Sequence, residues 1–150
     1  MTDLPAIYRE AQRSRQIAWI AQSHARLLGK PLVTSAVDPV LALWEDPRPI
    51  LAHGTEADPV FFFGNRAALT AFECDVDTFV TMPSRLSAEA PLREERQALL
   101  DRVRRNGFID DYAGMRISAR GRRFPIRDAL VFELSDPTGA RAGQAAVFAV

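Results

Sequence analysis

The segment Leu51–Phe72, LAHGTEADPVFFFGNRAALTAF, constrains the fold of this chain more than any other stretch. Its apolar run ends at Gly64-Asn65 and passes at once into an alanine-rich helical pattern with no further breaker. Asn65 suits the N-cap position because its side-chain oxygen accepts hydrogen bonds from the first free N–H groups of a helix. The segment therefore predicts a core strand that leads directly into a capped helix.

Length and composition predict one domain-sized core. The chain has 150 residues, 47% of them hydrophobic, which is enough for one core and too short for a second sizeable domain. No window approaches the ~18 apolar residues of a membrane span, and the charged start MTDLPAIYREAQRSRQ lacks the apolar core of a signal peptide. Cys74 is the single cysteine, which excludes an intramolecular disulfide and a cysteine-based zinc or iron–sulfur site. We expect a cytoplasmic protein.

The remaining periodicities predict an α+β fold with an antiparallel sheet. Short helical pieces are expected between residues 66 and 89, and the strongest helical pattern covers 92–106, with acids early and arginines late. The segment 37–49 predicts a short helix bracketed by prolines. Alternating patterns and turn signals predict strands over 50–53, 60–63, 115–119, 124–134 and 142–150.

The first 36 residues are expected to form an N-terminal helical extension, and residues 37–150 the main domain. A helix is predicted over 5–28, with Gly29 as its stop. Its apolar stripe at helical spacing consists of Ile7, Ala11, Ala18, Ala21, Ala25 and Leu28, and the apolar surface is widened by Ile17, Trp19, Ile20 and Leu27. Such a helix needs a surface to cover, either the open face of the sheet or the same helix of a second subunit. We expect a homodimer through this helix.

Several sequence blocks in a fixed order carry a resemblance to a known family. The blocks are HGTEADPVFFFGNRAAL, PSRLSAE, LREER, GFIDDYAGMRISARGRRFPI and GQAAVF. From about Leu41 to Phe148 the chain resembles the MEKHLA domain, a PAS-like family found at the C-terminus of plant homeodomain–leucine-zipper proteins and in stand-alone bacterial proteins. The resemblance implies a PAS-like fold: an antiparallel five-stranded sheet, a central block of short helices on one face, and an N-terminal helix. It also implies a sensing or interaction role in signalling or transcription regulation, without bringing catalytic residues.

His53 is the main candidate for an alternative, catalytic reading. It lies in HGTEADP, and a small hydrolase or isomerase would use it with Asp58 or Asp128. No serine lies in a G-x-S-x-G elbow, so nothing in the sequence supplies a recognised nucleophile. The alternative is that His53 organises the acidic loop, and we prefer it. We therefore expect a sensory module, with the small enzyme as the second hypothesis.

The cofactor is left unknown by the sequence, with a non-covalently bound flavin or another small organic ligand as candidates. Light-sensing PAS domains bond flavin through an Asn-Cys-Arg-Phe segment, whose counterpart here is Pro83-Ser84-Arg85-Leu86. A serine hydroxyl does not form the thiol adduct. Gln144 directly follows Gly143, one residue out of the receptors' register, which turns its side chain to the other face unless a bulge intervenes. Haem and metal are not expected, since His24 and His53 have no metal-ligand spacing.

Side-chain parity in the strands predicts an apolar ligand pocket with one polar handle. Asp128 interrupts an apolar face, which indicates either a pocket residue or a β-bulge, and the bulge is preferred. The alternative to a pocket is a solid core. The predicted pocket residues are Phe63, Phe72, Phe79, Met82, Leu86, Ile117, Phe124, Ile126, Asp128 and Gln144, and the predicted structural or site residues are His53, Asp58, Asn65 and Arg85.

The charge distribution suggests a partner surface on the predicted hairpin. Residues 112–127 contain five arginines and no acid, whereas the chain as a whole has zero formal net charge. Direct nucleic-acid binding is not expected, because aromatic interleaving and a recognition-helix signature are lacking. An adaptor that reads a regulatory protein through this hairpin is a third hypothesis, beside the ordinary solvated face of a sheet.

Overall fold

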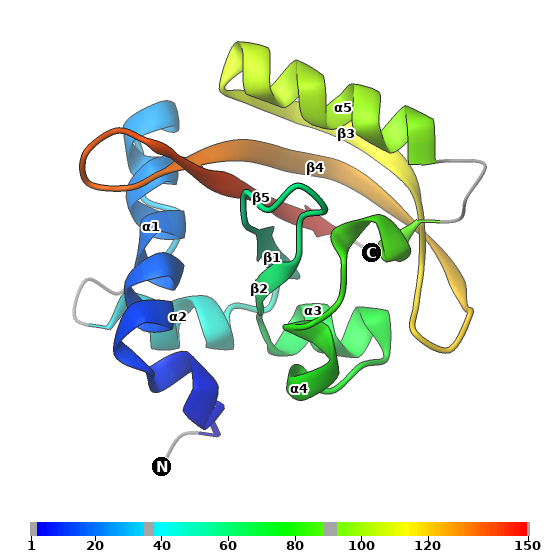
Figure 1. Ribbon diagram of the computed structural model, residues 1–150, viewed down its shortest axis with the longest axis horizontal. Helices are drawn as coiled ribbons and strands as arrows, with labels where there is room; N and C mark the ends of the chain where they lie inside the picture. The colour runs from blue at the N-terminus through cyan, green and yellow to red at the C-terminus, as the bar shows by residue number, and fades with distance from the viewer. Residues whose placement is uncertain (1–2, 35–37, 89–92, 150) are drawn as a thin grey trace.

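The computed structural model describes residues 3–34, 38–88 and 93–149. Within them, one antiparallel sheet has the strand order β2-β1-β5-β4-β3. The strands are β1 (Ile50–His53), β2 (Phe61–Gly64), β3 (Phe108–Ile117), β4 (Arg123–Ser135) and β5 (Arg141–Ala149). The helices are η1 (Ala6–Arg9), α1 (Ala11–Leu28), α2 (Pro39–Glu45), α3 (Arg66–Phe72), α4 (Val76–Phe79), η2 (Ser84–Ser87) and α5 (Arg93–Asn106). Figure 1 shows the short helices α3 and α4 below β1 and β2, at the opposite end of the molecule from α5. The α+β fold with a five-stranded antiparallel sheet, expected from the sequence, is confirmed.

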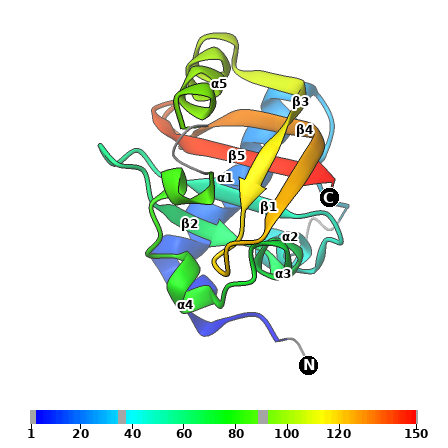
Figure 2. The same ribbon diagram turned by 90° about the vertical axis from the view of Figure 1, so that its right-hand side faces the viewer.

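The sheet separates two apolar clusters. Alternate residues of one strand serve both clusters, because successive side chains point to opposite faces. In β5, Ala145 and Val147 belong to the cluster under α1 and α2, whereas Phe148 belongs to the cluster under α3 and α5. In Figure 2, α1 lies behind the sheet and the β3–β4 hairpin lies toward the viewer.

Helix α1 covers its own sheet. Its buried residues are Ile17, Ile20, Ser23 and His24, and Gly29 ends the helix in the left-handed conformation, as expected. Of the apolar surface expected on this helix, Ile17 and Ile20 face the sheet, whereas Ala11 and Ala25 are exposed, because the larger isoleucines occupy the buried face. The apolar side of α1 is thus used within the chain, and a homodimer through that side would have to break these contacts.

The N-terminal helix is interrupted at Glu10, whose backbone is extended. The preceding turn places Tyr8 in the core, fully buried, where its ring lies 4.9 Å from that of Phe63. The Tyr8 hydroxyl donates to the Gly64 carbonyl at 2.8 Å and accepts from the Gly64 N–H at 2.9 Å. Burial raises the pKa of Tyr8 to about 12. The extension is therefore bonded into the end of β2.

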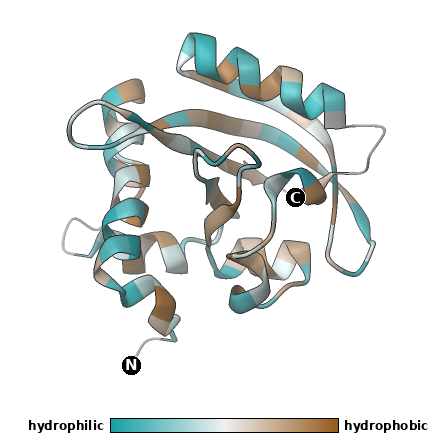
Figure 3. Cartoon of the chain, viewed as in Figure 1, coloured by the Kyte–Doolittle hydropathy of each residue, from teal (hydrophilic) through white to brown (hydrophobic). Residues whose placement is uncertain are grey.

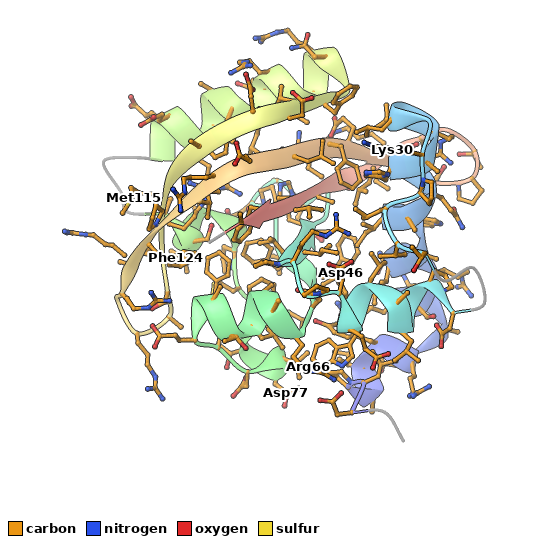
Figure 4. All side chains as sticks on the ribbon, turned by 180° about the vertical axis from the view of Figure 1, so that it is seen from behind. Lys30, Asp46, Arg66, Asp77, Met115 and Phe124 are labelled. Atoms are coloured by element: carbon orange, nitrogen blue, oxygen red, sulfur yellow. The ribbon has the colours of Figure 1, made fainter. Side chains whose placement is uncertain are left out.

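Asn65 is the N-cap of α3, as predicted. Its Oδ1 accepts from the N–H groups of Ala68 and Ile50, both at 2.9 Å. Its Nδ2 donates to the Leu43, Asp46 and Arg48 carbonyls at 3.0, 3.3 and 2.8 Å. One fully buried side chain thus joins β1, α2 and α3. Figure 4 labels Asp46 and Arg66 on the two sides of this junction.

The strand β3 begins earlier than expected. Periodicity predicted 115–119, but pairing with β4 already starts at Phe108 opposite Phe132. Two register shifts, between Ile109 and Tyr112 and between Tyr112 and Gly114, hide the alternation in the sequence. The bulge predicted at Asp128 is confirmed: the β4–β5 register shifts between Arg127 and Leu130, and Asp128 has φ of 50°.

Candidate ligand site

A small cavity lies between the inner face of the sheet and α5, with a volume of about 60 Å³. Its apolar wall is formed by Leu51, Phe61, Phe72, Ile126, Val131 and Phe148. Its polar wall includes His53, Ser87, Arg96 and Gln144, all of them buried. Buried polar groups are normally hydrogen-bonded, so their partners decide what the cavity can do.

His53 reaches the cavity from the end of β1 and is 5% exposed. Its Nδ1 lies 3.0 Å from the Gly54 carbonyl oxygen. A carbonyl only accepts, so Nδ1 carries the proton and donates. The other ring nitrogen, Nε2, is buried and has no hydrogen-bond partner. Burial lowers the pKa of His53 to about 4, which keeps the ring neutral near pH 7.

Gln144 lies on β5 directly opposite His53 in the strand pairing and is 2% exposed. Its Nε2 donates to the Leu100 carbonyl of α5 at 3.0 Å, while its Oε1 is buried without a partner. The β4–β5 register shifts between Leu134 and Ser135, beside Gly143 at φ of 140°, and the pairing is regular from Gln144 to Val147. Gln144 shares this face with Phe148, as the parity argument expected.

Arg96 is the cationic group of the cavity and is 8% exposed. No hydrogen bond or ion pair reaches its guanidinium from the residues that the structure describes. Burial, together with the nearby charge of Arg116, lowers the pKa of Arg96 to about 10. Arg96 is not among the site residues predicted from the sequence, although it shares a helical face with Leu99 and Val103, which are buried. In Figure 3, α5 is largely hydrophilic, so this narrow face is its contact with the core.

The predicted pocket residues fall into several groups. Phe72, Ile126 and Gln144 line the cavity. Phe79 and Phe124 are buried behind it: Phe79 stacks on Phe61 at 4.4 Å between ring centroids, and Phe124 lies edge-to-face with Phe72 at 5.1 Å. Figure 4 shows Phe124 pointing from β4 into the interior.

The other predicted pocket residues lie elsewhere. Phe63 packs against Tyr8 on the α1 side of the sheet, and Phe61 takes the cavity position because the β1–β2 register shifts after Ala52. Met82, Leu86 and Ile117 border a separate surface hollow beside Phe72. Asp128 borders an open groove near Val147, because the bulge turns it away from the core.

The residues of the catalytic hypothesis do not come together. Asp58 pairs with Arg85 at 3.1 Å on the surface, and Asp128 lies in the open groove. Neither makes a hydrogen bond or ion pair to His53. His24 is buried on the α1 side, its Nδ1 2.9 Å from the Lys30 carbonyl oxygen. Among the described residues, no three His, Cys, Asp or Glu side chains are placed to hold a metal ion.

The comparisons with known proteins identify the family. The family model of the MEKHLA domain, which describes the sequences of that family, matches residues 14–150 of this chain. The chain belongs to the MEKHLA domain family. No curated protein sequence matches it. Within the described residues of this family member, no helix has the length and apolar character of a membrane span.

Solved structures similar to this MEKHLA protein are PAS domains and photoreceptors. A PAS domain from Colwellia psychrerythraea has a TM-score of 0.63 at 10% identity, covering 72% of this chain and 89% of that one. The blue-light photoreceptor Vivid has a TM-score of 0.60 at 11% identity, covering 87% and 94%. An RNA-binding light-oxygen-voltage receptor has a TM-score of 0.63 at 12% identity, covering 80% of this chain and 35% of that one. At these identities the likeness shows the fold alone.

Proposed function

We propose that this protein is a PAS-like sensory module that binds a small organic ligand in the cavity and passes the bound state to a regulatory protein partner. The observation that carries the proposal is the polar wall: His53, Arg96 and Gln144 are each more than nine-tenths buried around one cavity. Buried polar atoms without partners are destabilising. Their retention is explained when a ligand satisfies them.

The contacts of α5 supply a route from cavity to surface. Arg96 and the Leu100 carbonyl both belong to α5, and the carbonyl is bonded to Gln144 of β5. A ligand that pairs with Arg96 therefore changes how α5 sits on the sheet. In this proposal residues 37–150 are the ligand-binding unit and residues 1–36 an extension that covers the sheet. A second copy of the chain would contact the outer side of α1.

A flavin is the less favoured ligand. A cavity of about 60 Å³ holds about four to six water-sized groups, which is far less than a three-ring isoalloxazine. Ser84, at the position of the adduct cysteine, is fully buried within η2, and its hydroxyl has no hydrogen-bond partner. The enzyme alternative is not favoured either, because neither Asp58 nor Asp128 makes a hydrogen bond or ion pair to His53.

Native mass spectrometry of freshly purified protein, with an absorption spectrum of the same sample, tests the proposal. We expect a retained small-molecule mass that disappears in Ala146→Leu, which fills the cavity, and persists in Ala113→Leu on the exposed part of β3. A wild-type protein that carries no ligand and is stabilised by no member of a small-molecule panel contradicts the proposal. A flavin spectrum would contradict the size argument.

A further inference from the structure

Ser87 already donates to the Ser84 carbonyl at 2.7 Å, and the other three buried polar side chains of the cavity differ in what they require from a ligand. Arg96 offers N–H donors and a positive charge. Gln144 uses its amide N–H on the Leu100 carbonyl, so its Oε1 is left as an acceptor. His53 uses Nδ1–H on the Gly54 carbonyl, so its Nε2 is a second acceptor. A ligand for this cavity must therefore carry an anionic acceptor for Arg96 and a hydrogen-bond donor for at least one of the two acceptors.

The charge at Arg96 selects an anion. No Asp or Glu lies among the described residues that line the cavity, and Arg116 lines it as a second cation. An uncompensated buried charge is strongly unfavourable. A carboxylate satisfies a guanidinium with two parallel hydrogen bonds, which is the geometry that Arg recognises best.

The donor group is best supplied by a hydroxyl. An ammonium group would bring a further positive charge next to Arg96 and Arg116, with no carboxylate in the cavity to balance it. A hydroxyl donates to the neutral acceptors of His53 and Gln144 without adding charge. These two residues face each other across the β1–β5 pair, so one hydroxyl between them can contact either acceptor.

The volume and the apolar wall limit the size of the ligand. A volume of about 60 Å³ corresponds to about four to six non-hydrogen atoms, by comparison with the space one water needs. Phe72, Ile126 and Phe148 offer an apolar surface for one methyl group. His53, Leu100 and Gln144 also border a hollow on the solvent side, so only a thin wall separates the cavity from solvent there.

We propose that the cavity binds a short 2-hydroxycarboxylate of lactate size, with its carboxylate on Arg96, its hydroxyl between His53 Nε2 and Gln144 Oε1, and its methyl group against the phenylalanines. This inference rests on the proposed function, since it names the ligand class for the same cavity. It adds Arg96 as the residue that selects an acid over a neutral molecule.

Isothermal titration calorimetry with four molecules of nearly equal size tests each requirement separately. L-Lactate is expected to bind one-to-one. Propionate, which lacks the hydroxyl, should bind about tenfold or more weakly. Lactamide, which lacks the charge, and L-alanine, which has an ammonium group in place of the hydroxyl, should bind at least as weakly as propionate.

Variants in α5 give the matched control. Arg96→Met should abolish L-lactate binding, whereas Arg102→Met, which removes an exposed arginine of the same helix, should leave it unchanged. Equal affinities for L-lactate, propionate and lactamide would overturn the inference, and so would the absence of binding by all four at millimolar concentration. Titration of the wild-type protein with the four molecules tests the inference even if the Arg96→Met variant does not fold. A different molecule retained in native mass spectrometry would overturn the hydroxy acid and leave the proposed function standing.

Discussion

His53 and Gln144 face each other across the pairing of β1 with β5, and each keeps one buried polar atom without a hydrogen-bond partner. Directly opposite positions in an antiparallel pair are the closest side-chain neighbours that a sheet offers. Here both neighbours are polar and both turn toward the cavity, whereas Leu51 and Phe148 fill the same face with apolar groups. This pair, together with Arg96 of α5 in the wall of the same cavity, distinguishes the site from an ordinary apolar core.

The burial of His53 predicts a stability loss in mild acid. Its folded-state pKa is about 4, below the ordinary value of 6.5. The unfolded chain therefore binds an additional proton between these values, and the folded state loses stability as pH falls from 6.5 toward 4. The loss is roughly 3 kcal/mol when complete. Urea unfolding at several pH values measures it.

His53→Gln is the matched variant for this pH dependence. Its free energy of unfolding should change less between pH 7 and pH 4.5 than that of the wild type. His24 stays in place in both proteins, and since burial also lowers its pKa, it contributes equally to both curves. Identical pH dependence of variant and wild type would show that His53 is not buried as a neutral ring.

Gly143 is expected to tolerate no side chain. A Cβ at this position would lie 2.0 Å from the His53 carbonyl oxygen, so Gly143→Ala forces β5 away from β1. We predict a loss of at least about 3 kcal/mol in the free energy of unfolding, measured by urea denaturation. Gly139→Ala is the control: its φ is also positive, at 89°, but nothing lies within 4 Å of its Cβ. A loss of about 1–2 kcal/mol is expected there, and equal losses would refute the clash.

Asn65→Ala should be among the most destabilising single changes. It removes two accepted and three donated hydrogen bonds of a fully buried group and leaves their backbone partners unpaired. We expect a loss of about 3–5 kcal/mol, measured by thermal and urea unfolding. Asp75→Ala removes the cap of α4, which accepts only from Thr78 at an exposed site, and should have a much smaller effect. Similar losses of stability in Asn65→Ala and Asp75→Ala would contradict the conclusion that Asn65 joins β1, α2 and α3.

Tyr8→Phe tests whether the N-terminal extension is part of the folded unit. The change keeps the ring against Phe63 and removes the hydroxyl that bonds both backbone groups of Gly64. A loss of about 1–3 kcal/mol in one cooperative transition is expected from urea unfolding. A transition that is unaltered, or that splits in two, would show that the extension folds separately.

The fold could be predicted from the sequence because the local signals that start and end its helices agree with the overall α+β arrangement. The Asn65 cap, the Gly29 stop and the 93–106 helix each follow from one local rule, and the structure has all three. The face of α1 that packs on the sheet could not be predicted from the sequence, because the alanines and isoleucines of this helix form two overlapping apolar stripes. Only packing against the sheet selects Ile17 and Ile20.

The site was less predictable from the sequence, because bulges shift side chains between faces. Gln144 followed from its parity with Phe148, but Phe61 replaces Phe63 in the cavity wall through the register shift in β1–β2. A one-residue change in register reverses the face, and a periodicity of two does not show it. Arg96 was detectable: a charged residue on the apolar stripe of a predicted helix marks a buried charge that needs a partner.

The most direct test of the ligand site is nitrogen-15 NMR of the two imidazole rings and the arginine side chains during titration with L-lactate. His53 and Arg96 line the cavity, whereas His24 lies on the opposite side of the sheet, packed on Phe132. The account predicts that the His53 Nε2 and Arg96 Nε resonances shift with saturation while those of His24 stay in place. Unchanged His53 and Arg96 resonances at saturating lactate, or equal shifts at both histidines, would contradict it.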